Sequence, residues 1–90
     1  MSAAVHLRIL SREGCGLCHE LVEALEVEFG PRAFELEWLD VDSRVEWKAR
    51  WGLVVPVLLD AHDTVLSETR LDAERVAAIT GCRRRDRRTR

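Results

Sequence analysis

The chain has 90 residues, of which 47% are hydrophobic and 33% are charged, and its formal net charge is −2. This length allows one small domain, and the composition excludes both a disordered chain and a membrane-spanning one. The first residues lack the basic and apolar regions of a secretory signal, so we expect a cytoplasmic protein with no membrane partner.

The first third of the chain alternates between strand and helix patterns. Apolar and polar residues alternate over residues 5–9, which predicts a strand. Residues 18–29 then carry apolar side chains at helical spacing, and Gly30-Pro31 ends this predicted helix. Alternation returns over residues 34–41 and predicts a second strand.

A second helix is expected after this strand. Ser43 and Glu46 have the spacing of a capping box, which predicts a helix that ends at Trp51, just before Gly52. Residues 54–59 predict a buried strand that tolerates a proline at its start.

The last elements are a hairpin partner and a helix. Residues 60–63 predict a turn, and residues 64–67 a returning strand. A final helix is expected from Asp72 to Gly81, with Val76 and Ile79 facing inward. The predicted order is therefore β-α-β-α-β-β-α.

A pair of thiols lies between the first strand and the first helix, in Gly14-Cys15-Gly16-Leu17-Cys18-His19. Cys15 falls at or near the helix N-terminus, where unpaired N–H groups and the helix dipole favour an anion. We expect this position to favour the Cys15 thiolate. Cys18, one turn later, is expected to point back and to attack a mixed disulfide formed on Cys15.

Three other interpretations of these cysteines are weaker. C-x-x-C-H is also an attachment motif for c-type haem, but a strand-first pattern does not suit a small haem-binding helical domain. A zinc site needs four ligands, and the remaining candidates are scattered along the chain. Two cysteines packed as small core residues are a further alternative. We expect no metal site and rank the redox pair first.

These patterns together resemble the thioredoxin fold in its glutaredoxin-like form. The likeness covers residues 4 to about 80 and includes the C-x-x-C motif, the aromatic–glycine pair at residues 51–52 and Val55-Pro56. The chain is similar to small bacterial glutaredoxin-like proteins with Cys-Gly-Leu-Cys. The resemblance implies an α/β fold with a central four-stranded mixed sheet flanked by three helices. We therefore expect one domain over residues 1–81, and the shift in composition after it predicts a basic tail over residues 82–90.

The same resemblance assigns roles to five residues. Cys15 would be the nucleophile and Cys18 the resolving thiol of a thiol–disulfide oxidoreductase, and Pro56 would be a cis-proline opposite them. Val55 would pair with an extended substrate through its backbone, and Arg12 would help to bind the substrate. The implied substrate is a disulfide-bearing protein or a small thiol compound, with no cofactor. The implied reductant is glutathione or a thioredoxin-reductase-type system.

A second hypothesis stays open. The Gly-Gly and acidic pair with which glutaredoxins bind glutathione has no counterpart in residues 67–72. On this hypothesis, the chain would be a non-catalytic module of the same fold. It would bind a metal, an iron–sulfur cluster or a partner protein through Cys15 and Cys18.

Other side chains have a functional and a structural interpretation. His19 is four residues after Cys15, so it is a candidate modulator of the thiolate, although an exposed first-turn position is the simpler interpretation. Asp40 and Asp42 are expected to be charges at the start of a helix rather than metal ligands. The tryptophans that we expect to pack in the core are Trp38, Trp47 and Trp51.

Charge is unevenly distributed. Residues 83–90 hold six arginines and one aspartate, a charge of +5, while eight basic and 15 acidic residues elsewhere give −7. The tail has no aromatic residue to stack on bases, so we expect a disordered end rather than a nucleic-acid interface. Cys82 next to it is expected to be a spectator thiol.

Overall fold

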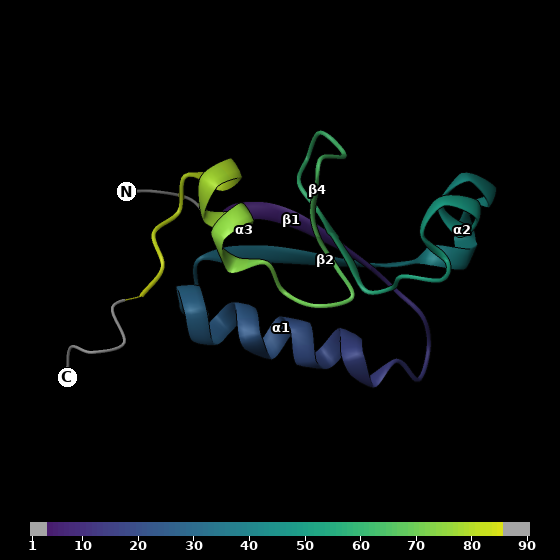
Figure 1. Cartoon of the computed structure of the whole chain (residues 1–90), viewed down its shortest axis with the longest axis horizontal. Helices are drawn as coiled ribbons and strands as arrows, with labels where there is room; N and C mark the ends of the chain where they lie inside the picture. The colour runs from purple at the N-terminus through teal and green to yellow at the C-terminus, as the bar shows by residue number, and fades with distance from the viewer. Residues whose placement is uncertain (1–3, 86–90) are drawn as a thin grey trace.

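The computed structural model describes residues 4–85 and contains the predicted order of elements (Figure 1). A 3-10 turn, η1, is added between the second strand and the second helix. The elements are β1 (Val5–Ser11), α1 (Gly16–Phe29), β2 (Phe34–Asp40), η1 (Val41–Ser43), α2 (Val45–Trp51), β3 (Val57–Leu59), β4 (Val65–Glu68) and α3 (Ala73–Thr80). Within this part of the chain, no helix is long and apolar enough to cross a membrane.

The four strands form one mixed sheet in the order β2-β1-β3-β4. β1 pairs in parallel with β2, and the parallel connection is made through α1. β3 is antiparallel to β1, with Leu10 opposite Val57, and pairs with β4 in an antiparallel hairpin, so that β4 is the other edge strand. The end of β1 and the start of β3 therefore lie side by side at one end of the sheet.

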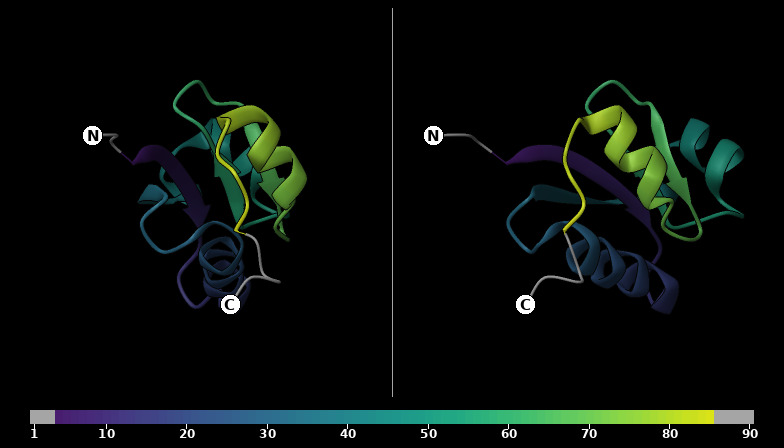
Figure 2. Two further views of the ribbon diagram at one scale, coloured as in Figure 1. Left: turned by 90° about the vertical axis from the view of Figure 1, so that its left-hand side faces the viewer. Right: turned by 60° about the vertical axis from the view of Figure 1, so that its left-hand side comes forward.

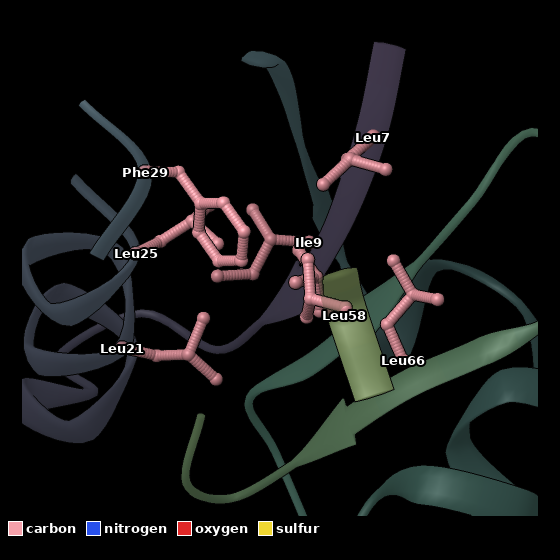
Figure 3. Packing of buried hydrophobic residues seen from close by; sticks show 8 residues of the cluster. Leu7, Ile9, Leu21, Leu25, Phe29, Leu58 and Leu66 are labelled. Atoms are coloured by element: carbon pink, nitrogen blue, oxygen red, sulfur yellow. The ribbon is translucent and has the colours of Figure 1, made fainter. Parts of the chain in front are cut away.

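α1 and α3 cover one face of the sheet and contribute side chains to the same core, with α3 above α1 in both views of Figure 2. The apolar side chains of α1 recur every three or four residues and point at the strands in Figure 3. This first core also takes in Val76 of α3. Its fully buried or nearly buried members are Leu7, Ile9, Leu21, Leu25, Phe29, Leu58, Leu66 and Val76.

The other face of the sheet is covered by α2, which Figure 1 shows at one end of the molecule. Strand alternation sends Leu10 to this face while its neighbour Ile9 joins the first core. Trp51 of α2 is 5% exposed and completes this second core. The buried members are Leu10, Val41, Trp51, Val57 and Leu59, with Trp47 packed against them. The helices thus flank both faces of the sheet.

Two predicted boundaries are wrong. Ser43 does not cap α2, because it belongs to η1 and its hydroxyl donates to the carbonyl of Asp40, so that Arg44 becomes the N-cap residue. The strand predicted over residues 54–59 is only Val57–Leu59. The residues before Pro56 instead form a loop, in which the Val54 N–H donates to the Trp51 carbonyl.

Two side chains predicted to be buried are not. Trp38 is 45% exposed because it lies on β2, which is an edge strand of the sheet. Ile79, in the last turn of α3, is 37% exposed. The predicted ends of α3 are confirmed: Asp72 accepts a hydrogen bond from the Arg75 N–H, and Gly81 has a left-handed φ of 78°.

The start of the basic tail contacts α1. Cys82 packs against the first core, and the Arg85 N–H donates to the Glu28 carbonyl over 2.6 Å. Arg84 pairs with the Glu28 carboxylate over 2.7 Å. The tail was predicted to be disordered over residues 82–90, but Cys82, Arg84 and Arg85 make these contacts, and residues 86–90 lie outside the described residues.

Candidate active site

The end of the sheet where β1 stops and β3 starts gathers most of the candidate residues. The cysteine loop, residues 12–15, follows the end of β1. Pro56 directly precedes β3, whose first residue, Val57, is opposite Leu10. The two loops are also joined directly, because Arg12 Nη1 donates to the Gly52 carbonyl over 2.9 Å. Strand pairing thus brings together residues about 40 positions apart in the sequence.

Cys15 is the N-cap residue of α1, as expected from the motif. Its backbone is extended, and its N–H donates to the Arg12 carbonyl over 3.1 Å, which closes a tight turn. Gly14 within this turn has a φ of +79°, a conformation that favours glycine. Cys15 is partly exposed at the helix N-terminus, so a substrate disulfide can reach it.

Cys18 is one turn further along α1 and only 1% exposed. The pKa of its thiol is raised from an ordinary value of 9.0 to about 11, mainly by burial and in part by a hydrogen bond with the Cys15 side chain. A hydrogen bond with the Arg12 backbone opposes part of this pKa increase. Both thiols are free, so the structure holds the reduced pair.

The Arg12 side chain is engaged within the chain. Its Nε donates to Asp42 Oδ2 over 2.8 Å and its Nη2 donates to Asp42 Oδ1 over 2.9 Å. This bidentate pair raises the pKa of Arg12 and lowers that of Asp42. Gly52 fits closely here, since a Cβ at that position would lie 2.5 Å from the Lys48 carbonyl oxygen. Arg12 therefore fastens the cysteine loop to η1 and to the loop before Pro56.

The Val55–Pro56 peptide bond is cis, as the resemblance implies, and Pro56 is fully buried. Thr69 fixes this loop from the other side. Its hydroxyl donates to the Val54 carbonyl over 3.0 Å, and its N–H donates to the Pro56 carbonyl over 2.7 Å. Between these two, the N–H and carbonyl of Val55 make no hydrogen bond within residues 4–85. They are free to pair with an extended chain.

His19 is exposed on the first turn of α1, in line with its simpler interpretation. Its imidazole lies against the indole of Trp38, with ring centroids 5.3 Å apart and planes inclined by 37°. Trp38 is therefore neither a core residue nor isolated. It supports a side chain that starts four residues after Cys15, on the same side of the helix.

A groove of about 790 Å³ lies between α1 and the segment that leads into α3. It begins at Leu17, between the two cysteines, and reaches the Glu28–Arg84 pair at the far end of α1. Thr69, Arg70 and Asp72 line its other side. An extended substrate could therefore continue from the cysteines along α1.

The sequence did not reveal the partner of Arg12. Asp40 and Asp42 were predicted to be charges at the start of a helix, and both are: Asp42 lies in the first turn of η1, and Asp40 is the N-cap residue that accepts the Asp42 N–H. Only the fold places Asp42, in η1 just after β2, beside the turn that follows β1. In the described part of the chain, no group of three or more His, Cys, Asp or Glu side chains has the arrangement to hold a metal ion.

Comparison with known proteins identifies a family. The glutaredoxin-like domain family (DUF836) matches residues 6–79. A protein of Nitrosomonas europaea, solved by solution NMR, is 28% identical over 88% of this chain and 94% of its own, with a TM-score of 0.72. A protein of X. campestris, solved by X-ray crystallography, is 31% identical over 83% of this chain and 95% of its own, with a TM-score of 0.64. No curated protein matches the chain.

Proposed function

This chain belongs to the glutaredoxin-like domain family and has a thioredoxin-like fold, and on that basis we propose that it is a thiol–disulfide oxidoreductase. The observation that carries the proposal is the unequal pair of thiols. Cys15 is reachable at the N-terminus of α1, whereas Cys18 is buried one turn behind it. One cysteine can therefore meet a substrate while the other waits inside the protein.

The reaction proceeds in two exchanges. The Cys15 thiolate attacks one sulfur of a substrate disulfide, a bond forms between Cys15 and that sulfur, and the other sulfur leaves as a thiolate. Cys18 then loses its proton and attacks Cys15, which forms the Cys15–Cys18 disulfide and releases the second substrate thiol. The protein dithiol supplies two electrons and two protons, and the substrate disulfide becomes two thiols.

The environment of Cys18 suits the order of these steps. Its raised pKa keeps it a neutral thiol at neutral pH, so it does not compete with Cys15 for the substrate. Part of that increase comes from the Cys15 side chain, through a hydrogen bond and through its charge. A mixed disulfide on Cys15 removes that charge, so Cys18 becomes a stronger acid at the stage when it must ionise and attack.

Substrate binding is assigned to the Val55 backbone and to the groove along α1. The free N–H and carbonyl of Val55 would form strand-like hydrogen bonds with residues next to the substrate disulfide, and Pro56 would pack beside it. His19, held by Trp38, would modulate the proton balance at Cys15. A disulfide-bearing protein or a small disulfide would be the oxidant, with glutathione or a thioredoxin-reductase-type system as the reductant.

The test is to trap the intermediate. Reduced Cys18→Ser protein, in a Cys82→Ser background, is incubated with a small symmetrical disulfide, and its intact mass is measured. We expect one substrate half attached to Cys15, and we expect Cys15→Ser in the same background to gain no adduct. The unsubstituted pair should end as the Cys15–Cys18 disulfide, two mass units lighter than the dithiol.

A matched control is Ser11→Ala, which leaves both thiols in place and should still form the disulfide. The proposal fails if the Cys18→Ser protein takes up the adduct no faster than unfolded protein does. It also fails if Cys15→Ser and the unsubstituted pair reduce a disulfide at the same rate.

A further inference from the structure

The guanidinium next to the cysteine loop has one edge already occupied by a carboxylate. Nε and Nη2 of Arg12 form the side-on edge of the group, and both donate to Asp42, over 2.8 and 2.9 Å. This bidentate geometry is the one with which arginine recognises carboxylates in general. Any carboxylate on a substrate would have to compete with Asp42 for the same two N–H groups.

The backbone of Arg12 lies next to the residue that carries the reacting sulfur. The Arg12 carbonyl accepts the Cys15 N–H over 3.1 Å, and the charge of the Cys15 thiolate contributes to the raised pKa of Arg12. A substrate whose sulfur reaches Cys15 therefore brings its nearest substituents into the field of Arg12. With Asp42 bound, that field is largely neutralised at short range.

The pair is also accessible and replaceable. The side chains of Arg12 and Asp42 are 40% and 36% exposed, and exposed pairs of this kind are weak and screened by salt. The third contact of Arg12, from Nη1 to the Gly52 carbonyl, does not involve Asp42. Without the Asp42 carboxylate, Gly52 would still hold the guanidinium beside the cysteine loop while its Nε–Nη2 edge became free.

We propose that Asp42 is a specificity-determining residue: its carboxylate fills the binding edge of Arg12 and so selects against disulfide substrates that carry a carboxylate near the sulfur. The inference rests on the disulfide exchange proposed above. It assigns the site to neutral or cationic disulfides, among them disulfides within polypeptides whose flanking residues are not acidic. It also replaces the expected direct contact of Arg12 with a substrate by a contact within the chain.

Two small disulfides of similar size provide the probe. Bis(2-hydroxyethyl) disulfide is neutral, and 3,3′-dithiodipropionate carries one carboxylate on each half. The rate at which each oxidises the reduced full chain in a Cys82→Ser background is measured by quenching with an alkylating agent and reading masses. The quantity compared between variants is the ratio of the carboxylate rate to the neutral rate, because a general change in reactivity or folding cancels in it.

Asp42→Asn should raise this ratio by up to about fivefold, the upper end for one exposed ion pair, and the increase should shrink in high salt. Asp40→Asn is the matched control, because it removes a neighbouring negative charge but leaves the Arg12–Asp42 pair intact, so its ratio should stay near that of the unsubstituted chain. The double variant Asp42→Asn/Arg12→Gln should lose the increase. Asp42→Glu, which restores a carboxylate, should lower the ratio again.

Each other result overturns the inference. An equal increase in Asp40→Asn or in the double variant would mean that only the local charge matters. An unchanged ratio in folded Asp42→Asn would mean that the edge of Arg12 does not meet the substrate. If Asp42→Asn does not fold, Arg12→Gln alone decides, because a fall in the ratio would show that Arg12 already binds carboxylates. The proposed function fails separately, if neither disulfide oxidises Cys15 and Cys18 in the chain that carries only Cys82→Ser.

Discussion

The acidity of Cys18 offers a quantitative test of the site. With a pKa of about 11 in place of the ordinary 9.0, Cys18 is about one part in a thousand thiolate at pH 8, against about one part in ten for an unperturbed thiol. Its intrinsic reactivity with iodoacetamide should therefore be about a hundredfold lower at that pH. The rate should keep rising by about tenfold per pH unit until the pH reaches the pKa.

Replacing Cys15 tests the cause. Both Cys15 contributions, the hydrogen bond and the charge, raise the Cys18 pKa, so Cys15→Ala should lower it. Burial is the largest cause and stays in place, so the new pKa should lie between 9.0 and about 11. The pKa shift is upward because a thiol ionises to an anion, and a nearby negative charge or the loss of surrounding water disfavours that anion.

The assay follows the alkylation rate of Cys18 by peptide mass spectrometry over a pH series. The midpoint of the rate profile gives the pKa without reference to the absolute rate, so the poor accessibility of this buried thiol does not affect it. Cys15→Ser is the control, because a hydroxyl keeps a hydrogen-bonding partner but carries no charge. A Cys18 midpoint at or below 9, or an upward shift in Cys15→Ala, would refute the reasoning.

Two further predictions concern stability. Leu58→Ala leaves a cavity at a fully buried position between the sheet and α1, so it should lower the free energy of unfolding in urea by about 2–5 kcal/mol. The control Leu53→Ala, at a fully exposed position, should change this free energy by less than about 0.5 kcal/mol. Similar losses in both variants would contradict the packing described. The pKa of Cys18 is higher in the folded than in the unfolded protein, so this thiol stabilises the fold fully below about pH 9. The free energy of unfolding should therefore fall by at most about 2.7 kcal/mol as the pH rises from 9 toward 11. Cys18→Ala should lack this part of the pH dependence.

The order of elements was readable from the sequence because local patterns determine it. Alternation in β1, the three-to-four spacing in α1 and the Asp72 and Gly81 caps of α3 each depend on residues within one element. The errors arose where a neighbouring element competed. Ser43 has the right spacing for a capping box, but the Asp40 carbonyl takes its hydroxyl. Trp38 is exposed because β2 ends up at the edge of the sheet, which no local pattern specifies.

The features of the candidate site also fall into those that local sequence determines and those that depend on the fold. The sequence by itself determined that Cys15 begins a helix and that Cys18 lies one turn behind it, because glycine, helix geometry and the C-x-x-C spacing are local properties. Only the tertiary structure decided that Arg12 binds Asp42 and Gly52, since antiparallel pairing of β1 with β3 and parallel pairing with β2 bring three distant loops to one end of the sheet. Burial decided the raised pKa of Cys18 for the same reason: removal of water from a side chain is a property of the packed fold and not of its neighbours in the chain.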